Sequence, residues 1–438
     1  MFPLSLSPFF IFIFSLLTAS YVSAAPLCGL VPPTQTTQSV HGSATNISAS
    51  EDVLAAAWYP GWLGTQFPPN TISWSKYNVL TFAFAVTTPD SSVISLDSVS
   101  QQVLPIFVAE AKKNSVNALV SIGGWTGSQY FSTAVATEAN RTAFLGAVLG
   151  LVSQYQLDGI DFDWEYPNKQ GIGCNIISPN DSANFLLFLQ ALRAKAPSNL
   201  IISAAVGTAP FNGADGTPMT DVSGFAAVLD HIAIMAYDIW GSWSTAGVGP
   251  NAPLDDSCAP TKAGSATSAV EAWTAAEFPA NKIALGIASY GHSFHVDAAN
   301  ALSSPGQLAA YPTFDKAQQP AGYKEDGGGG VDQCGAPVGV GGVFDFWGMI
   351  DGGFLNADGW PADGIDYRYD NCSQTPYVYN KSTQVMISYD DPTSFAAKGE
   401  FINANGLRGF AMWHSAGDSN DILIDSISGA MGIEQICS

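Results

Sequence analysis

Eight short apolar runs recur along the chain from about Val53 onward, with helical stretches between several of them. Apolar strands that alternate with helices indicate a parallel sheet with helical crossovers. Eight such units predict a closed (β/α)8 TIM barrel, with an open doubly wound sheet as the structural alternative. The candidate strands are residues 54–58, 79–85, 118–122, 159–165, 201–206, 231–237, 283–288 and 408–413.

One interval breaks this rhythm, between the seventh and eighth candidate strands. It is glycine-rich at 327–330 and aromatic-rich at 344–389. A structureless loop of this length is improbable in a compact fold, so we predict a small inserted α+β domain. The predicted divisions are a signal peptide at 1–24, a mobile Ser/Thr/Pro-rich arm at 25–50, the catalytic barrel at 51–290 and 388–438, and the insertion at 291–387.

The N-terminus resembles a secretory signal. An apolar run at 9–17 is followed by small residues around Ser23, and it is shorter than the roughly 20 residues that a bilayer requires. An uncleaved membrane anchor is the alternative. The six cysteines include no CxxC pair, which favours disulfides over zinc. We expect a secreted glycoprotein, with sequons at Asn46, Asn140, Asn180, Asn371 and Asn380.

The stretch DGIDFDWEYP, residues 158–167, concentrates acid on one predicted strand. Asp161, Asp163 and Glu165 alternate with apolar residues, so they project to the same side, which is inward in a barrel. Like charges this close raise one another's pKa, so one carboxyl tends to keep its proton. Glu165, at the rim, is the predicted general acid. Asp158 precedes the strand and is predicted to be a structural hydrogen-bonding residue.

Two other interpretations of this acidic strand are weaker. A metal site would require further ligands, and the five histidines are scattered along the chain. A purely structural ladder of carboxylates would be costly to bury. We therefore expect neither a metal nor a cofactor.

These residues resemble glycoside hydrolase family 18, the chitinases and their relatives. The acidic stretch matches the DGxDxDxE signature at every acidic position. Further matches follow in the family's order, and the resemblance runs from about Trp58 to Asp418. The further matching motifs are SIGGW at 121–125, MAYD at 235–238, YG at 290–291 and GFAMW at 409–413.

The resemblance implies hydrolysis of β-1,4-linked N-acetylglucosamine, in which the acetamido oxygen of the sugar attacks the anomeric carbon. By position, Glu165 would protonate the glycosidic oxygen and then activate water. Asp163 would orient the acetamido group, with Asp161 behind it sharing a proton. Tyr237 would hydrogen-bond the acetamido oxygen, and Asp238 would help to distort the sugar.

The resemblance also implies a sugar-binding surface of aromatic rings, because flat sugar faces stack on them. Trp413 would form the floor of the reacting subsite and Trp125 would flank the groove. His292 stands where the family usually has Arg, and we assign it no function. Less specific candidates, for which core packing is the alternative, are Gly124, Met235, Trp58, Tyr59, Phe84 and Trp240.

The chain is strongly acidic, with a net charge of -22 and only 15 Lys and Arg residues, which argues against nucleic-acid binding. Solubility explains the acidity, and a preference for partly deacetylated chitin is the alternative. The prediction is a monomeric, secreted chitinase that acts on chitin or its oligosaccharides. A non-catalytic chitin-binding relative and an endo-β-N-acetylglucosaminidase acting on N-glycans are the competing functions.

Overall fold

The computed structural model describes residues 28–31, 53–304, 306–324 and 329–437. Eight parallel strands close into a barrel, because β2 pairs with both β3 and β17. The predicted (β/α)8 barrel is confirmed, and the open sheet is wrong because no gap remains between the first and last strands. The barrel strands are β2 (Leu54–Pro60), β3 (Val79–Thr87), β5 (Asn117–Gly123), β6 (Gly159–Asp163), β7 (Ile201–Val206), β8 (His231–Ile234), β9 (Ile283–Ala288) and β17 (Gly409–Trp413).

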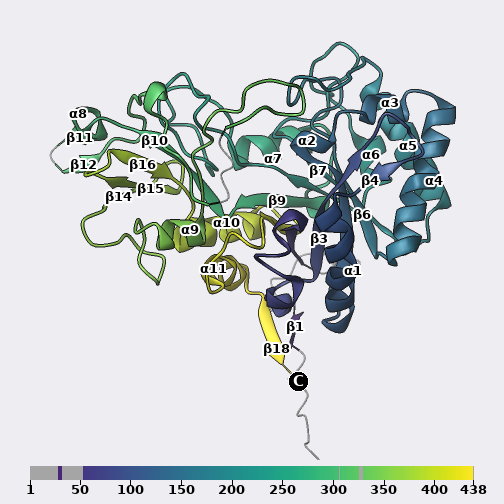
Figure 1. The fold of residues 1–438 in the computed structure, drawn as a ribbon, viewed down its shortest axis with the longest axis horizontal. Helices are drawn as coiled ribbons and strands as arrows, with labels where there is room; N and C mark the ends of the chain where they lie inside the picture. Colours follow the sequence, from purple (N-terminus) through teal and green to yellow (C-terminus); the bar gives the residue numbers. More distant parts are fainter. Residues whose placement is uncertain (1–27, 32–52, 305, 325–328, 438) are drawn as a thin grey trace, which may run out of the picture.

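Helices surround this barrel on the right-hand side of Figure 1. They begin where a short polar side chain accepts the unpaired amides of the first turn. Asp97 accepts the amides of Val99 and Ser100, and Asp391 forms a capping box with Ser394. The helices are α1 (Ser98–Lys113), α2 (Gly124–Gly127), α3 (Phe131–Val135), α4 (Glu138–Tyr155), α5 (Asp181–Lys195), α6 (Ser223–Ala226), α7 (Ala266–Ala275), α10 (Pro392–Ala404) and α11 (Ile422–Met431).

Two separate cores follow from the alternation of side chains along the strands. On β2, Ala55, Ala57 and Tyr59 join the large core between strands and helices. Leu54, Ala56 and Trp58 face the inside of the barrel. The interior core is rich in alanine, which leaves room for larger side chains and for the acids of β6. Its other alanines are Ala83, Ala205, Ala233, Ala284 and Ala411.

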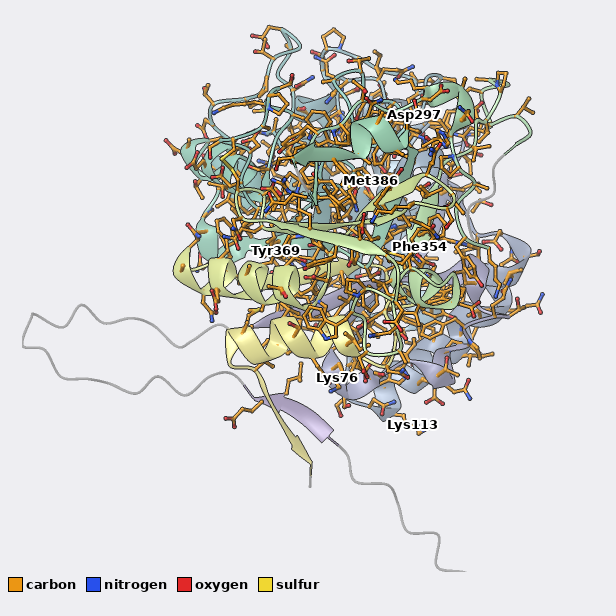
Figure 2. All side chains as sticks on the ribbon, turned by 90° about the vertical axis from the view of Figure 1, so that its left-hand side faces the viewer. Lys76, Lys113, Asp297, Phe354, Tyr369 and Met386 are labelled. Carbon is orange, nitrogen blue, oxygen red and sulfur yellow. A yellow bond between two sulfur atoms is a disulfide. The ribbon has the colours of Figure 1, made fainter. Side chains whose placement is uncertain are left out.

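The interval between β9 and β17 builds a five-stranded antiparallel sheet in the order β13-β10-β16-β15-β14. It lies beside the barrel in Figure 1, and Figure 2 looks onto it from the side that carries Tyr369 and Met386. The predicted domain boundaries stay predictions. The sheet strands are β10 (Tyr290–His295), β13 (Val343–Asp345), β14 (Asp366–Asp370), β15 (Thr375–Asn380) and β16 (Val385–Ser388).

Short elements complete the chain. The insertion also contains α8 (Ala298–Ala301), β11 (Leu302–Ser304), β12 (Gln307–Leu308) and α9 (Phe346–Asp351), and β4 (Ile94–Ser95) pairs with β3. Two disulfides, Cys174–Cys334 and Cys258–Cys372, join the barrel loops to the insertion. No helix in the described part of the chain has the length and hydropathy needed to cross a membrane.

Four residues within the predicted mobile arm at 25–50 form a strand. Strand β1 (Cys28–Val31) pairs antiparallel with β18 (Glu434–Cys437), with Cys28 opposite Cys437. Local periodicity missed this strand because the strand that it pairs with, β18, comes from the other end of the sequence. The remaining arm residues and the predicted signal peptide lie outside the described residues.

Candidate active site

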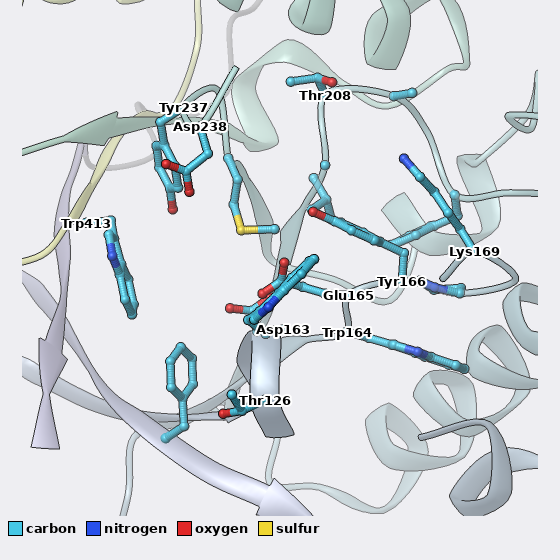
Figure 3. Close-up of a pocket in the computed structure, with 18 of the residues that line it drawn as sticks. Thr126, Asp163, Trp164, Glu165, Tyr166, Lys169, Thr208, Tyr237, Asp238 and Trp413 are labelled. Atoms are coloured by element: carbon cyan, nitrogen blue, oxygen red, sulfur yellow. The ribbon is translucent and has the colours of Figure 1, made fainter. Parts of the chain in front are cut away.

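A cleft of about 840 Å³ opens at the carboxyl ends of the barrel strands. Asp163 and Glu165 lie between Trp413 on one side and Tyr166 and Lys169 on the other (Figure 3). This end of a TIM barrel carries the active site in enzymes of this fold. The lining includes Trp62, Phe84, Asp97, Trp125, Thr126, Asp163, Trp164, Glu165, Tyr166, Lys169, Met235, Tyr237, Asp238 and Trp413.

Asp161 lies deepest among the acids of β6, and three donors satisfy its carboxylate. Ser121 and Ser203 each donate a hydroxyl at 2.7 Å, and Trp58 donates its indole N–H at 3.3 Å. Burial raises the pKa of Asp161, although the three hydrogen bonds oppose the shift. The indole of Trp58, whose role the sequence left open, therefore supports the acid from inside the barrel.

Asp163 and Glu165 are also buried, and their surroundings favour the neutral form. Burial, followed by the charges of Glu165 and Asp161, holds the pKa of Asp163 well above its usual range. Its Oδ1 has no hydrogen-bond partner among the described residues. Burial raises the pKa of Glu165 to about 7, with a further contribution from Asp238 and an opposing hydrogen bond from Tyr166. These two carboxyls therefore form a proton-holding pair at the cleft.

Glu165 was predicted to end its strand, but β6 ends at Asp163. The pairings with β5 and β7 both stop at Asp163, so the chain leaves the sheet two residues before Glu165. The backbone of Glu165 is fixed from both sides. Its amide donates to Ser128 Oγ at 3.0 Å, and its carbonyl accepts from Asn175 Nδ2 at 2.8 Å.

The raised pKa of Glu165 predicts a pH-dependent stability. Burial raises the pKa of this carboxyl from 4.5 in the unfolded chain to about 7 in the fold, so its contribution to stability falls as the pH rises from 4.5 through 7. Glu165→Gln removes this penalty, and we expect it to stabilise the protein by up to about 3 kcal/mol at pH 8 and by none of that at pH 4. Urea unfolding of both proteins at the two pH values measures the difference.

Glu271→Gln is the matched control for this experiment, because it makes the same chemical change at an exposed position of α7. We expect it to have the same small effect at pH 4 and pH 8. A gain for Glu165→Gln that is equal at both pH values would contradict the assigned shift.

Tyr237 and Asp238 reach the cleft from the segment that follows β8. Burial, with smaller contributions from the charges of Asp163, Asp238 and Glu165, raises the pKa of the Tyr237 phenol well above its usual range. Tyr237 therefore stays protonated and can donate a hydrogen bond. Asp238 has a half-exposed side chain and a left-handed backbone, with φ of 55°.

The aromatic side of the cleft is a set of three rings. Phe84 stacks on Trp413, with centroids 5.5 Å apart, and on Trp62, with centroids 6.2 Å apart. Trp125 is half exposed at the rim. Met235 also lines the cleft. The structure thus brings Trp413, Trp125, Phe84 and Met235 to the cleft surface.

Three other sequence candidates do not line the cleft. Tyr59 faces the helices rather than the barrel interior, because it follows inward-facing Trp58, and it is buried against Phe67 and Phe107. Trp240 is buried and packs on Tyr311. Gly124 has φ of 77°, and a Cβ there would meet the Phe84 ring at 2.8 Å. Gly124 therefore permits the position of Phe84 and does not offer a surface to a ligand.

Several cleft residues were not candidates from the sequence. Trp62, Tyr166 and Lys169 line the cleft, and Lys169 lies 5.0 Å from the ring centre of Tyr166. They lie on the segments that follow β2 and β6. Their closeness in sequence to the ends of these two predicted strands could have marked them as cleft residues. His292, to which no function was assigned, has its Nε2 2.7 Å from Asp238 Oδ1. Asp158 has the predicted structural role, since it accepts the amide of Ala118 at 2.9 Å.

A metal site would need several ligating side chains in one place. Across residues 28–31, 53–304, 306–324 and 329–437, no group of three or more His, Cys, Asp or Glu side chains is arranged to hold a metal ion.

A closed (β/α)8 barrel with an aromatic cleft and neighbouring carboxyls at its carboxyl end has the features of a barrel glycoside hydrolase. The sequence profile of glycosyl hydrolases family 18 matches residues 55–418. The chain belongs to that family.

Relatives in sequence and structure agree with this assignment. A "chitinase-like effector" from Moniliophthora roreri is 51% identical over 87% of this chain and 93% of its own length. Chitinase A1 from Niallia circulans is 30% identical over 70% of this chain and 42% of its own length. A crystal structure of a chitinase from Rhizomucor miehei has a TM-score of 0.77 and 31% identity, covering 86% of this chain and 100% of its own.

Proposed function

We propose that this protein is a chitinase that hydrolyses β-1,4-linked N-acetylglucosamine with the help of the substrate's acetamido group. The observation that carries the proposal is the pair of buried carboxyls, Asp163 and Glu165, in a cleft lined by aromatic rings. Burial raises the pKa of Glu165 to about 7, which suits a group that must first give a proton and then take one. The family and the chitinase names of its relatives support the substrate class.

Glu165 is the general acid of the first step. Its proton passes to the glycosidic oxygen as the bond from that oxygen to the anomeric carbon breaks. The acetamido oxygen of the same sugar supplies the electron pair that closes a five-membered oxazolinium ring. In the second step the Glu165 carboxylate removes a proton from water, whose oxygen attacks the anomeric carbon and reopens the ring with retained configuration.

Asp163, Tyr237 and Asp238 position the sugar in this scheme. Asp163, protonated before the reaction because burial and the neighbouring acids raise its pKa, orients the acetamido group. As the oxazolinium ion forms, Asp163 passes this proton toward Asp161 and carries the charge that balances the ion. Asp161, held by its three donors, stays behind it and shares a proton with it. The Tyr237 phenol donates a hydrogen bond to the acetamido oxygen, while Asp238 accepts a hydrogen bond from a hydroxyl group of the distorted sugar ring.

The aromatic rings account for binding of the rest of the chain. Trp413, stacked on Phe84, offers a flat floor to the sugar at the reacting bond. Trp62 and Trp125, each about half exposed, extend this surface along the cleft. We also propose that the protein is secreted, because its two described disulfides are typical of an oxidising compartment.

A chitin-binding protein without turnover is the second candidate function. The name "chitinase-like effector", carried by two of its relatives, does not itself establish hydrolysis. The carboxyl set of Asp161, Asp163 and Glu165 favours catalysis over binding alone. The cleavage of N-glycan cores uses the same chemistry and differs in substrate.

One experiment separates these functions. The wild-type protein is incubated with soluble chitin tetramer to hexamer and, separately, with a high-mannose glycoprotein, and the products are followed by mass spectrometry. We expect cleaved oligomers and an intact glycoprotein. Calorimetric binding of the oligomers without cleavage would replace the proposal with a binding function, and release of the N-glycan would replace it with glycoprotein processing.

A further inference from the structure

Asp238 is held by two donors that converge on one of its oxygens. Tyr290 donates its hydroxyl to Asp238 Oδ1 at 2.7 Å, and His292 Nε2 lies 2.7 Å from the same oxygen. The other oxygen makes no hydrogen bond among the described residues, and the side chain is half exposed at the cleft (Figure 3). One oxygen is therefore anchored, and the second is left for a ligand.

The backbone of Asp238 is linked through Asn251 to β10, the strand that carries Tyr290 and His292. Its amide donates to Asn251 Oδ1 at 3.0 Å, and Asn251 Nδ2 donates to the Tyr290 carbonyl at 3.0 Å. Asn251 is completely buried. A left-handed aspartate is conformationally costly and persists where its surroundings hold it. Strand β10 thus fixes both the backbone and the carboxylate of Asp238.

The surroundings of His292 define its tautomer. Its side chain is only 4% exposed, and its Nδ1 is buried with no hydrogen-bond partner among the described residues. Because Nε2 faces a carboxylate, Nε2 carries the hydrogen. A second hydrogen on Nδ1 would be a buried donor without an acceptor, which is costly. His292 is therefore a neutral donor.

Aromatic contacts hold the His292 ring in this orientation. Trp243 packs edge-on against it at 5.1 Å and Tyr290 at 5.8 Å, with interplanar angles of 83° and 88°. The ring can therefore be replaced by another ring without opening a large space. It can also be replaced by a side chain that keeps a donor at the same reach.

We propose that His292 is a positioning residue, which as a neutral Nε2–H donor fixes the free oxygen of Asp238 toward the sugar at the reacting bond. This inference rests on the proposed function. A histidine at this place supplies the hydrogen bond without the fixed positive charge of the arginine that the family usually has.

Two variants separate the hydrogen bond from the packing. His292→Phe keeps a ring against Trp243 and removes the donor, while His292→Gln keeps a donor at similar reach. We expect His292→Phe to lower kcat on chitin tetramer by about ten- to a hundredfold, because a misplaced positioning group lowers the rate of the chemical step. KM should change less than about threefold. His292→Gln should retain most of the wild-type kcat. Unchanged kcat in His292→Phe, or equal losses in both variants, would overturn the proposal.

A spectroscopic readout does not depend on turnover. The ¹⁵N resonances of the His292 ring, assigned by their loss in His292→Phe, should show a protonated Nε2 and a bare Nδ1 in the wild-type protein. Asp238→Asn should move the Nε2–H resonance. An Nδ1–H tautomer, or a resonance that Asp238→Asn leaves in place, would overturn the proposal. Failure of the wild type to cleave any oligomer would instead count against the proposed function.

Discussion

Glu165→Gln is expected to lower kcat on chitin oligomers by about 10³- to 10⁴-fold, because one side chain is assigned both proton transfers. Glutamine keeps the shape and an oxygen for the Tyr166 hydroxyl, but its amide neither gives nor takes the proton that bond cleavage requires. The backbone at residue 165 is held by Ser128 and Asn175, so the loop should keep its place. Steady-state rates on the tetramer, with affinity measured separately by calorimetry, test this.

The control for this variant is Glu271→Gln on the exposed face of α7, which should retain full activity. Affinity for the tetramer should stay within about threefold of wild type in Glu165→Gln, since the aromatic rings that bind the sugars are untouched. A variant that keeps more than about a tenth of the wild-type kcat would remove Glu165 from the role of general acid.

The barrel could be predicted from the sequence because its evidence is repeated. Barrel strands that bury both faces show as apolar runs, β6 with its two alternating acids being the exception, and all eight predicted runs overlap an observed strand. Strand β1 shows the limit of this approach. Its four residues are held by β18, more than four hundred positions away, and a short local pattern contains no trace of such a partner.

The site could be predicted where it follows strand alternation. Asp161 and Asp163 alternate with Phe162 and Trp164, and the structure places the acids on the inner side and the aromatic residues against the helices. The same alternation should have excluded Tyr59, which is one position out of phase with inward-facing Trp58. An aromatic residue beside a motif is not evidence of a ligand surface unless its face of the strand is known.

Contacts between distant loops could not be predicted. His292 lies on the first strand of the insertion and Asp238 follows β8, and their 2.7 Å contact depends on how the insertion leaves β9. The sequence marked His292 only as a departure from the family pattern. That departure was informative, because the histidine contacts one of the predicted site residues.

A chitin oligomer with a free amine in place of the acetamido group at the reacting unit is expected not to be cleaved, with a loss of at least about 10³-fold. An attacking group already attached to the substrate reacts as if it were present at very high concentration, and removing it forfeits that advantage. The comparison uses two tetramers of defined sequence, one deacetylated at the reacting unit and one at a terminal unit away from it. Only the second should be hydrolysed, as followed by mass spectrometry.

The carboxyls of the cleft explain why no enzyme group should replace the missing acetamido oxygen. The lining includes Asp97, Asp163, Glu165 and Asp238. Asp97 caps α1, and the proposed mechanism uses Glu165 for proton transfer. Burial and the neighbouring acids hold the pKa of Asp163 well above its usual range, and a protonated carboxyl is a poor nucleophile.

Asp238 is the remaining carboxyl, and its geometry makes the experiment decisive. One of its oxygens is fixed by Tyr290 and His292, so the carboxylate cannot rotate without breaking two hydrogen bonds. Cleavage of the oligomer deacetylated at the reacting unit would mean that an enzyme carboxylate attacks after all. A covalent sugar adduct on Asp238 in the mass spectrum of the protein would then identify it, and the substrate-assisted mechanism would have to be abandoned.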